Sequence, residues 1–564
     1  MVWEIINRGE QWLGGDLIQH IYNNRNTDFK TQTNFNLNQL HHYQDLKDID
    51  AACTRIARAI VEKEKIIIVG DYDSDGATST ALMMLALELF GSYNHSYVVP
   101  NRFEFNYGLS PELIQTMLDD KPSLIITVDN GISSLEGVDF ANKHHIDVII
   151  TDHHLAPSSL PDALAIVNPN QPDDLFPSKA LAGVGVAFYV MLALRQHLYE
   201  KKIIRDLPNM SQFLDLVALG TIADLVPMDY NNRILVFNGL KRIKSDPRVG
   251  VQQLIEQSKC DLAYLTSEDI GYQIAPKLNA AGRLKDISVG IQCLLSQDKS
   301  QAFSLVSQLC QLNSERKNLD QHMIKEAEQL LQNNTHHEPA IVLYQPDWHQ
   351  GVIGILASKL KEKMYQPVFI FARTNDNELK GSGRSISGIN LKEVLSMIHE
   401  KDASIMNGFG GHAMAAGLSI PIENIERFKQ ALFREISSYS SDLFKKTYAS
   451  DGALFDADLS IQNALAIEAN GPWGQTFEEP LFHGHFKIVD QTLIGGKHLK
   501  LNLRHFRGTR KIPAIIFNID PDVWSEYETI EAIYRLKINR FRKQHLFQLQ
   551  IIDAKKVTEN LCIQ

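Results

Sequence analysis

Three aspartates stand at alternate positions directly after an apolar run in the stretch KIIIVGDYDSDGATST, residues 65–80. They are Asp71, Asp73 and Asp75. Carboxylates this close repel one another unless a positive charge lies between them. A bound metal ion would supply that charge, although three solvated acids in a turn are an alternative. The stretch therefore predicts a cation site at the end of a strand.

Further acids and histidines follow two other apolar runs. Asp129 ends the run LIITVD, and Asp152, His153 and His154 follow the run DVIIT. In an open parallel sheet the loops after the strands form the ligand crevice, so these side chains should converge. Oxygen-rich ligands with one or two imidazoles favour Mn²⁺ or Mg²⁺ over structural zinc. We expect two ions, with Asp129 as the bridging ligand because it stands alone on the middle loop. Two such ions can assist an in-line displacement at phosphorus, which indicates hydrolysis of a phosphoester.

A second histidine pair gives an internal comparison. His144 and His145 precede the run IDVIIT, whereas His153 and His154 follow it. At roughly 3.3 Å per residue, the intervening strand separates the two pairs by about 20 Å. Only His153 and His154 can therefore reach the aspartates.

The elements that position these residues alternate along the chain. Short apolar runs between 65 and 168 alternate with helix-like segments such as ATSTALMMLALELF, which is typical of parallel strands joined by crossover helices. Leucines at near-helical spacing predict a long helix over 301–332, followed by a second α/β unit. Short alternating strands predict a β-barrel near the C-terminus.

Length and composition limit the class of protein. The chain has 564 residues, of which 44% are hydrophobic and 22% charged, as in ordinary globular proteins. No apolar run approaches the 18 or so residues that span a bilayer, and the first residues lack a secretory signal, so we expect a cytoplasmic protein without a membrane partner. The five cysteines form no CxxC pair, so neither a zinc site nor a disulfide framework is indicated. The predicted arm, catalytic domain, connecting helix, second α/β domain and barrel have these bounds: 1–45, 46–300, 301–335, 336–445 and 452–560.

Four motifs in fixed order are similar to those of the DHH phosphoesterase superfamily: VGDYDSDG, TVDNG, TDHH and LGTIADLVPM. LNAAGRL, WHQGVIGILASKL, GSGRSISGINL and GFGGHAMAAG resemble the RecJ family of 5′ to 3′ exonucleases, and the resemblance covers nearly the whole chain. It implies an α/β fold in which a long helix joins a parallel-sheet DHH domain to a DHHA1 domain, with a C-terminal OB-fold. It also implies release of 5′-mononucleotides from single-stranded DNA in recombination and repair. A monomer is implied, with single-strand-binding protein and a repair helicase as partners.

The resemblance also implies roles for individual residues. Its metal ligands would be Asp71, Asp73, Asp75, Asp129, His153 and Asp224. Asp152 would accept a hydrogen bond that orients an imidazole. His154 would face the scissile phosphate and either stabilise its charge or protonate the leaving oxygen. Asp224 has an alternative interpretation as the end of a helix before Pro227.

Recognition of a 5′ end is implied for a further set: Arg102, Arg283, Ser382 and Arg384. Guanidinium groups suit a terminal phosphate because they bind it in a bidentate manner. The glycines of GSGRS would let the backbone approach that phosphate, unless they only form a turn. His412 is a candidate DNA contact, although helix packing also explains the glycines around it. Phe105 and Asn106 replace the usual acidic residue and glycine of RecJ proteins, so the resemblance does not specify the shape of the pocket near Arg102.

The net charge of −11 means that DNA must be held by local basic patches. Two basic clusters with phenylalanines nearby, 497–511 and 535–543, suit single-strand binding through phosphate contacts and base stacking. The candidate residues are Lys500, Arg504, Arg507, Arg540 and Arg542. A barrel with a solvated basic face is the alternative.

Two other functions compete with the exonuclease. A DHH enzyme acting on small phosphoesters, such as oligoribonucleotides or cyclic dinucleotides, would share the metal site but would not need a basic barrel. A non-catalytic DNA-binding scaffold would have lost metal ligands, whereas every expected ligand position is filled in this sequence.

Overall fold

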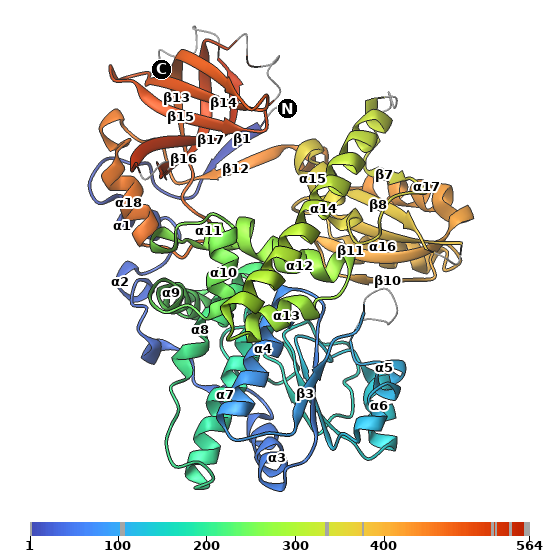
Figure 1. Ribbon diagram of the computed structural model, residues 1–564. Helices are drawn as coiled ribbons and strands as arrows, with labels where there is room; N and C mark the ends of the chain where they lie inside the picture. Colours follow the sequence, from blue (N-terminus) through green and yellow to red (C-terminus); the bar gives the residue numbers. More distant parts are fainter. Residues whose placement is uncertain are drawn as a thin grey trace. The chain divides into compact units, whose positions relative to one another are not determined.

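The chain folds into two compact units, shown coloured along the sequence in the computed structural model of Figure 1. The structure describes residues 3–101, 108–332, 338–374, 377–519, 524, 527–540 and 544–557. The smaller unit comprises residues 1–4, 279–286 and 307–447. The larger unit comprises residues 5–278, 287–306 and 448–564.

A five-stranded parallel sheet lies at the centre of the larger unit, in the order β3-β2-β4-β5-β6. Its strands are β2 (Ile66–Gly70), β3 (His95–Val98), β4 (Leu124–Val128), β5 (Asp147–Thr151) and β6 (Ala165–Val167). All residues of β2 and β4 are buried, as expected for strands of a parallel sheet covered on both faces. The predicted parallel sheet is confirmed.

The register of this sheet aligns the ends of its central strands. Gly70 pairs with Val128, and Val128 pairs with Thr151. The next residue after each of these is an aspartate, namely Asp71, Asp129 or Asp152. The three carboxylates therefore leave the sheet at the same level.

Helices surround this sheet in the larger unit. Those that flank the sheet or continue from it are α3 (Ile49–Glu62), α4 (Ser74–Leu89), α5 (Pro111–Gln115), α6 (Leu135–Lys143), α7 (Gly183–Glu200), α8 (Leu214–Ala223), α9 (Tyr230–Ser245), α10 (Val249–Gln257), α11 (Ser267–Asp269) and α13 (Ser288–Leu295). The N-terminal segment adds β1 (Trp3–Asn7), α1 (Leu17–Asn23) and α2 (Phe29–Gln32), and β1 pairs with β12 (Lys446–Ser450).

The C-terminal part of the larger unit is a closed barrel in the strand order β13-β14-β15-β17-β16, preceded by α18 (Ile461–Ala469). The strands are β13 (Phe482–Ile494), β14 (His498–His505), β15 (Ile512–Phe517), β16 (Thr529–Asn539) and β17 (Leu546–Lys556). In β14, Leu499, Leu501 and Leu503 are buried, whereas Lys500 and Arg504 are exposed. This alternation confirms the predicted barrel, because every second residue of a barrel strand faces its core.

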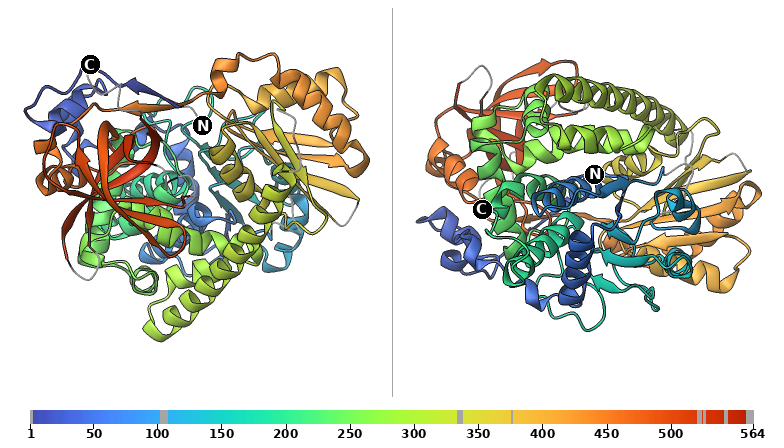
Figure 2. Two further views of the ribbon diagram at one scale, coloured as in Figure 1. Left: turned by 90° about the horizontal axis from the view of Figure 1, so that it is seen from above. Right: turned by 60° about the horizontal axis from the view of Figure 1, so that its bottom comes forward.

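The smaller unit contains a mixed sheet in the order β10-β11-β9-β8-β7. Its strands are β7 (Ile341–Tyr344), β8 (Val368–Arg373), β9 (Glu378–Arg384), β10 (Gly408–Gly411) and β11 (Ala415–Pro421), and its helices are α15 (Ile353–Met364), α16 (Leu391–Lys401) and α17 (Ile425–Ile436). The helices α12 (Ala275–Leu284) and α14 (Lys299–Gln332) run from the larger unit into the smaller one. Both views in Figure 2 show α14 as one continuous helix, as predicted.

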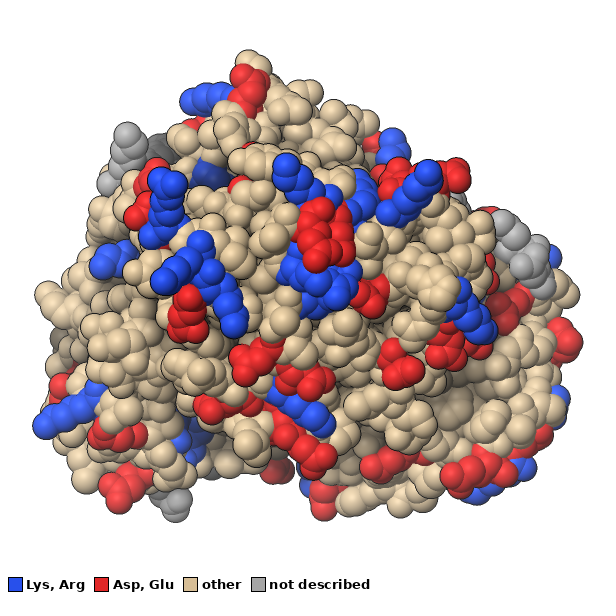
Figure 3. Space-filling model, turned by 90° about the horizontal axis from the view of Figure 1, so that it is seen from below, with Lys and Arg blue, Asp and Glu red and all other residues tan. Residues whose placement is uncertain are grey.

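The surface carries charges of both signs. On the face drawn in Figure 3, basic and acidic side chains are interspersed. A polyanion would therefore be attracted by local groups of cations on this face rather than by a uniformly basic surface. Within the described residues, no helix is long and apolar enough to cross a membrane.

Candidate metal centre

The DYDSDG segment turns the chain from β2 into α4. Asp73 is the N-cap of α4, and its carboxylate accepts hydrogen bonds from the backbone N–H groups of Asp75 and Gly76 at 2.9 and 3.1 Å. Gly76 is required here, because an added Cβ would lie 2.5 Å from the carbonyl oxygen of Asp71. Asp71 is buried at the strand end, and its carboxylate accepts the Tyr72 N–H at 2.7 Å. The alternation of acids therefore follows from a tight, capped strand-to-helix turn.

Asp75 lies fully inside the protein, against the first turn of α7. Its carboxylate accepts the backbone N–H groups of Gly183 and Val184 at 2.6 and 2.9 Å. Burial and the charge of Asp73 together raise the pKa of Asp75 to about 7, although the two N–H donors oppose the shift. Gly183 and Val184 were not predicted from the sequence. The helix-opening GVGV pattern, with glycines that admit a close approach, was the available signal.

Asp129 occupies a left-handed conformation at the end of β4, with φ of 63°. The side chain of its neighbour Asn130 donates to the carbonyl oxygens of Val69 and Val128 at 3.0 and 2.9 Å, which ties the ends of β2 and β4 together. Burial and the charges of Asp75 and Asp73 raise the pKa of Asp129 well above the usual carboxyl value. Asparagine and aspartate tolerate this backbone conformation better than most residues.

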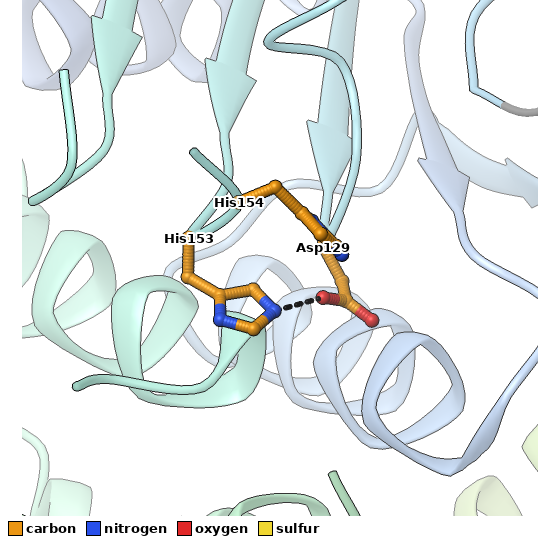
Figure 4. A group of neighbouring side chains, drawn as sticks. All are labelled: Asp129, His153 and His154. Atoms are coloured by element: carbon orange, nitrogen blue, oxygen red, sulfur yellow. Dashed lines mark ion pairs between the residues drawn. The ribbon is translucent and has the colours of Figure 1, made fainter. Parts of the chain in front are cut away.

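His153 points toward Asp129 from the loop after β5, as Figure 4 shows. Its Nε2 atom lies 3.1 Å from a carboxylate oxygen of Asp129, 3.5 Å from one of Asp224 and 4.0 Å from one of Asp75. One imidazole therefore lies within reach of three carboxylates that come from different segments of the chain. The structure thus brings the strand-end residues together, as the sequence predicts.

His154 and Asp152 form a hydrogen-bonded pair at the edge of this cluster. The Nδ1 atom of His154 lies 2.7 Å from the Asp152 carboxylate, which also accepts the Ile132 N–H at 2.9 Å. Burial disfavours the charged forms of both groups, but their mutual hydrogen bond and the neighbouring charges together outweigh it: the pKa of Asp152 falls to about 2 and that of His154 rises to about 9. Asp152 thus orients the imidazole of His154.

Three overlapping groups at this edge of the sheet have ligand atoms within 4.8 Å of one another. They are Asp71, Asp73 and Asp129; Asp75, His153 and Asp224; and Asp129, His153 and His154. Asp129 belongs to two of them, as a bridging ligand would. Carboxylates with pKa values raised by their mutual repulsion gain most from a cation between them, and oxygen donors with imidazole suit Mn²⁺ or Mg²⁺. The residues therefore fit a divalent metal centre.

Three of the predicted 5′-end residues surround the start of α15 in the smaller unit. The Arg384 guanidinium is bonded to the hydroxyls of Ser382 and Ser358 at 3.1 and 3.2 Å and to the Gly383 carbonyl at 2.8 Å. Arg283 donates to the carbonyl of Gly351 at 3.3 Å. Burial lowers the pKa of Arg384. Within the described part of the chain, no carboxylate pairs with this half-buried guanidinium, so an anion would be favoured beside it.

The glycines of GSGRS lie in β9 and pack against the neighbouring strand β8. A Cβ at Gly381 or Gly383 would lie 2.5 or 2.4 Å from the rings of Phe371 and Phe369. Both glycines are therefore needed for packing of β9 against β8. His412 is exposed in the turn between β10 and β11. Three predicted positions lie outside the described residues: Arg102, Phe105 and Asn106.

The basic residues of the barrel fall into two classes. Lys500, Arg504 and Arg507 are exposed, and Phe506 beside them is 50% exposed. Arg540, by contrast, bonds both carboxylate oxygens of Glu468 at 2.7 and 2.9 Å and lies over the ring of Tyr264 at 4.6 Å. Arg542 lies outside the described residues. The first group has the features of a strand-binding surface, and Arg540 is engaged within the protein.

Comparison with family models defines the class. The model of the DHH family, N-terminal domain, matches residues 65–221, that of the DHHA1 domain matches 337–438, and that of the RecJ OB domain matches 450–553. The parallel sheet with its acid and histidine cluster is thus that of a DHH phosphoesterase, and the predicted fold class is confirmed.

Whole-chain relatives define the family more closely. The single-stranded-DNA-specific exonuclease RecJ of Salmonella typhimurium is 44% identical over 549 residues, and that of Escherichia coli 42% identical over 549, each match covering 95% of both chains. The chain belongs to the RecJ family of single-stranded-DNA-specific exonucleases. The crystal structure of RecJ from Thermus thermophilus in complex with Mn²⁺ superposes with a TM-score of 0.81 at 27% identity, covering 96% of this chain and 76% of that one.

Proposed function

We propose that the protein is a divalent-metal-dependent exonuclease that removes 5′-mononucleotides from the 5′ end of single-stranded DNA in recombination and repair. The observation that carries this proposal is the convergence of the strand-end acids and His153 in overlapping groups that share Asp129. Family membership supports the substrate, and the related Thermus structures in complex with Mn²⁺ or Mg²⁺ support the use of such ions.

The proposed ligands of two ions are Asp71, Asp73, Asp75, Asp129, His153 and Asp224. Divalent ions held there would activate water and neutralise charge at the scissile phosphate. Asp129 would be shared by the two ions, and the N-terminus of α7 would hold the Asp75 carboxylate in place. The Asp129 carboxylate also packs directly against Gly183 in the first turn of α7. Because the same turn contacts both Asp75 and Asp129, these two ligands have little freedom to move apart.

His154 is the proposed proton donor to the leaving oxygen. Its hydrogen bond to Asp152 fixes the ring and keeps a proton on Nδ1, so Nε2 on the opposite side of the ring is the atom that would face the phosphate. Asp152 would act only through His154.

The proposed site for the 5′ phosphate comprises Arg283, Ser382 and Arg384, with Arg102 added from the sequence. The half-buried Arg384 guanidinium, paired with hydroxyls and a carbonyl, supports this assignment. Exposed Lys500, Arg504 and Arg507 would hold the strand on the barrel, and His412 would contact it on the smaller unit. Binding of single-strand-binding protein and a repair helicase, a monomeric state and a cytoplasmic location remain predictions.

Digestion of one oligonucleotide labelled at either end tests the proposal. With Mn²⁺, the wild type should release labelled mononucleotide at once from the 5′ label and give a shrinking ladder from the 3′ label. Asp129→Ala should do neither while still binding DNA. DNA binding without cleavage by the wild type would favour the scaffold function, and release from the 3′ label first would contradict the polarity.

A further inference from the structure

The proposed ligand Asp224 lies in a loop that needs support from elsewhere. The loop connects α8 to α9, and Asp224 caps the C-terminus of α8. The following residue, Leu225, has a left-handed conformation with φ of 59°, which is unfavourable for leucine. The Asp224 side chain is 24% exposed, compared with 0% for Asp75 and 3% for Asp129. Of these three ligands, Asp224 has the least packing of its own.

A turn at residues 473–477 packs against this loop. The backbone N–H of Met228 donates to the carbonyl oxygen of Gln475 at 2.8 Å. A Cβ added to Gly474 would lie 2.5 Å from Cγ of Met228, whose side chain is buried. Met228 follows Asp224 by four residues, so the turn contacts the loop directly at its far end.

The turn is itself held in a fixed shape. Gly474 and Phe477 exchange backbone hydrogen bonds of 3.0 and 3.2 Å. The rings of Trp473 and Phe477 stack with centroids 5.2 Å apart and planes 8° apart, and the Arg233 guanidinium lies 4.1 Å from the Phe477 centroid. The Trp473 indole also donates to the Ile467 carbonyl at 2.9 Å. A rigid turn can transmit its position to the loop that it contacts.

The turn leads directly into the barrel. Glu479, two residues after it, pairs with Lys537 at 2.7 Å and with Arg535 at 3.6 Å, both from β16. The segment is therefore anchored by the barrel at one end and contacts the Asp224 loop at the other. This arrangement gives the second basic cluster of the barrel a role in holding the segment.

We propose that the turn 473–477 positions the metal ligand Asp224, acting through Met228, and so sets the metal affinity of the site. Gly474 and Gln475 are positioning residues, because they contact the loop and not the ligands. The inference rests on the proposed metal-dependent function. It predicts that a change at Gly474 weakens metal binding more strongly than it weakens DNA binding.

Gly474→Val tests the proposal, because the added side chain would displace Met228. Isothermal calorimetry with Mn²⁺ alone should show a dissociation constant raised about tenfold or more, as for other groups that orient metal ligands. The Mn²⁺ concentration for half-maximal rate should rise in parallel. At saturating Mn²⁺, kcat and the KM for a single-stranded oligonucleotide should stay within about twofold of wild type.

Two controls separate positioning from general damage. Met228→Ala in the Gly474→Val protein makes room for the valine and should restore most of the Mn²⁺ affinity. Leu501→Ala removes a buried side chain from the barrel core, so it should lower stability without changing Mn²⁺ affinity. Unchanged Mn²⁺ affinity in folded Gly474→Val, or an equal loss in Leu501→Ala, would overturn the proposal. Failure of the wild type to bind Mn²⁺ would overturn the metal site itself.

Discussion

Gly183 contacts two proposed metal ligands without being a ligand itself. Its N–H donates to Asp75, and an added Cβ would lie 2.5 Å from the Asp129 carboxylate. Gly183→Ala should therefore displace Asp129 and weaken Mn²⁺ binding about tenfold or more, measured by calorimetry. Gly185→Ala is the matched control on the same helix, because its Cβ would approach only the end of the Leu181 side chain, at 3.1 Å. Equal effects of the two substitutions would contradict the assignment.

We expect Asp129 to destabilise the protein when no metal is bound. Its carboxylate is buried beside Asp75 and Asp73, and both burial and their charges raise its pKa. In a chelator, Asp129→Asn should raise the free energy of unfolding by about 1 to 3 kcal/mol, because it removes a repelled buried charge. With Mn²⁺ in excess the order should reverse, since only the wild type gains from binding. Urea titrations with and without chelator measure both, and a variant less stable than wild type in chelator would be inconsistent with this explanation.

Strand β9 places Ser382 and Arg384 beside the start of α15. We expect these two residues to recognise the 5′ end of the DNA. Arg384→Ala should reduce the preference for a 5′-phosphate over a 5′-hydroxyl about tenfold or more, because a charge-assisted contact is lost. Lys380→Ala, exposed on the same strand, should leave the preference unchanged. The preference is the ratio of kcat/KM on the two oligonucleotides. If Arg384→Ala slowed both substrates equally, the arginine would not recognise the phosphate.

Repetition along the chain made the parallel sheet predictable. Apolar strands alternate with helices, and the acids stand one residue beyond aligned strand ends, so convergence of Asp71, Asp129 and Asp152 follows from the topology. The hydrogen bond from the Gly183 N–H to Asp75 could not be predicted, because it joins residues 108 positions apart in the chain. No local periodicity records such a contact.

Ion pairing distinguishes basic residues within both clusters of the barrel, since Arg510 of the first cluster also pairs with a carboxylate, that of Asp456. In the sequence they look alike, but Arg540 and Lys537 meet Glu468 and Glu479 in the fold, whereas Lys500 and Arg504 face outward. A charge pattern indicates where cations are, and only the tertiary structure shows which of them are neutralised. For the same reason, the packing of residues 473–477 against the Asp224 loop could not be read from composition.

For the molecule as a whole, the net charge of −11 leads us to predict that the exposed cations of the barrel supply much of the affinity for DNA. Replacing Lys500 and Arg504 together by glutamine should raise the KM for a long single strand. It should also reduce the slope of log KM against log salt by about 1.4, since each lost phosphate contact in single strands contributes about 0.7. Arg540→Gln is the comparison, because that guanidinium is engaged with Glu468. An unchanged salt slope in the double variant would contradict a role of the barrel surface in DNA binding.

The most direct test of the central claim is digestion of oligonucleotides that carry one phosphorothioate, at either the 5′-terminal or the 3′-terminal linkage. Sulfur in place of a phosphate oxygen binds Mg²⁺ poorly and softer divalent ions better. If hydrolysis begins at the 5′ end at a divalent metal centre, only the 5′ substitution should delay the first release in Mg²⁺, and Mn²⁺ or Cd²⁺ should restore it. Equal rates for both oligonucleotides in Mg²⁺, or a delay from the 3′ substitution alone, would contradict a metal-dependent exonuclease that starts at the 5′ end.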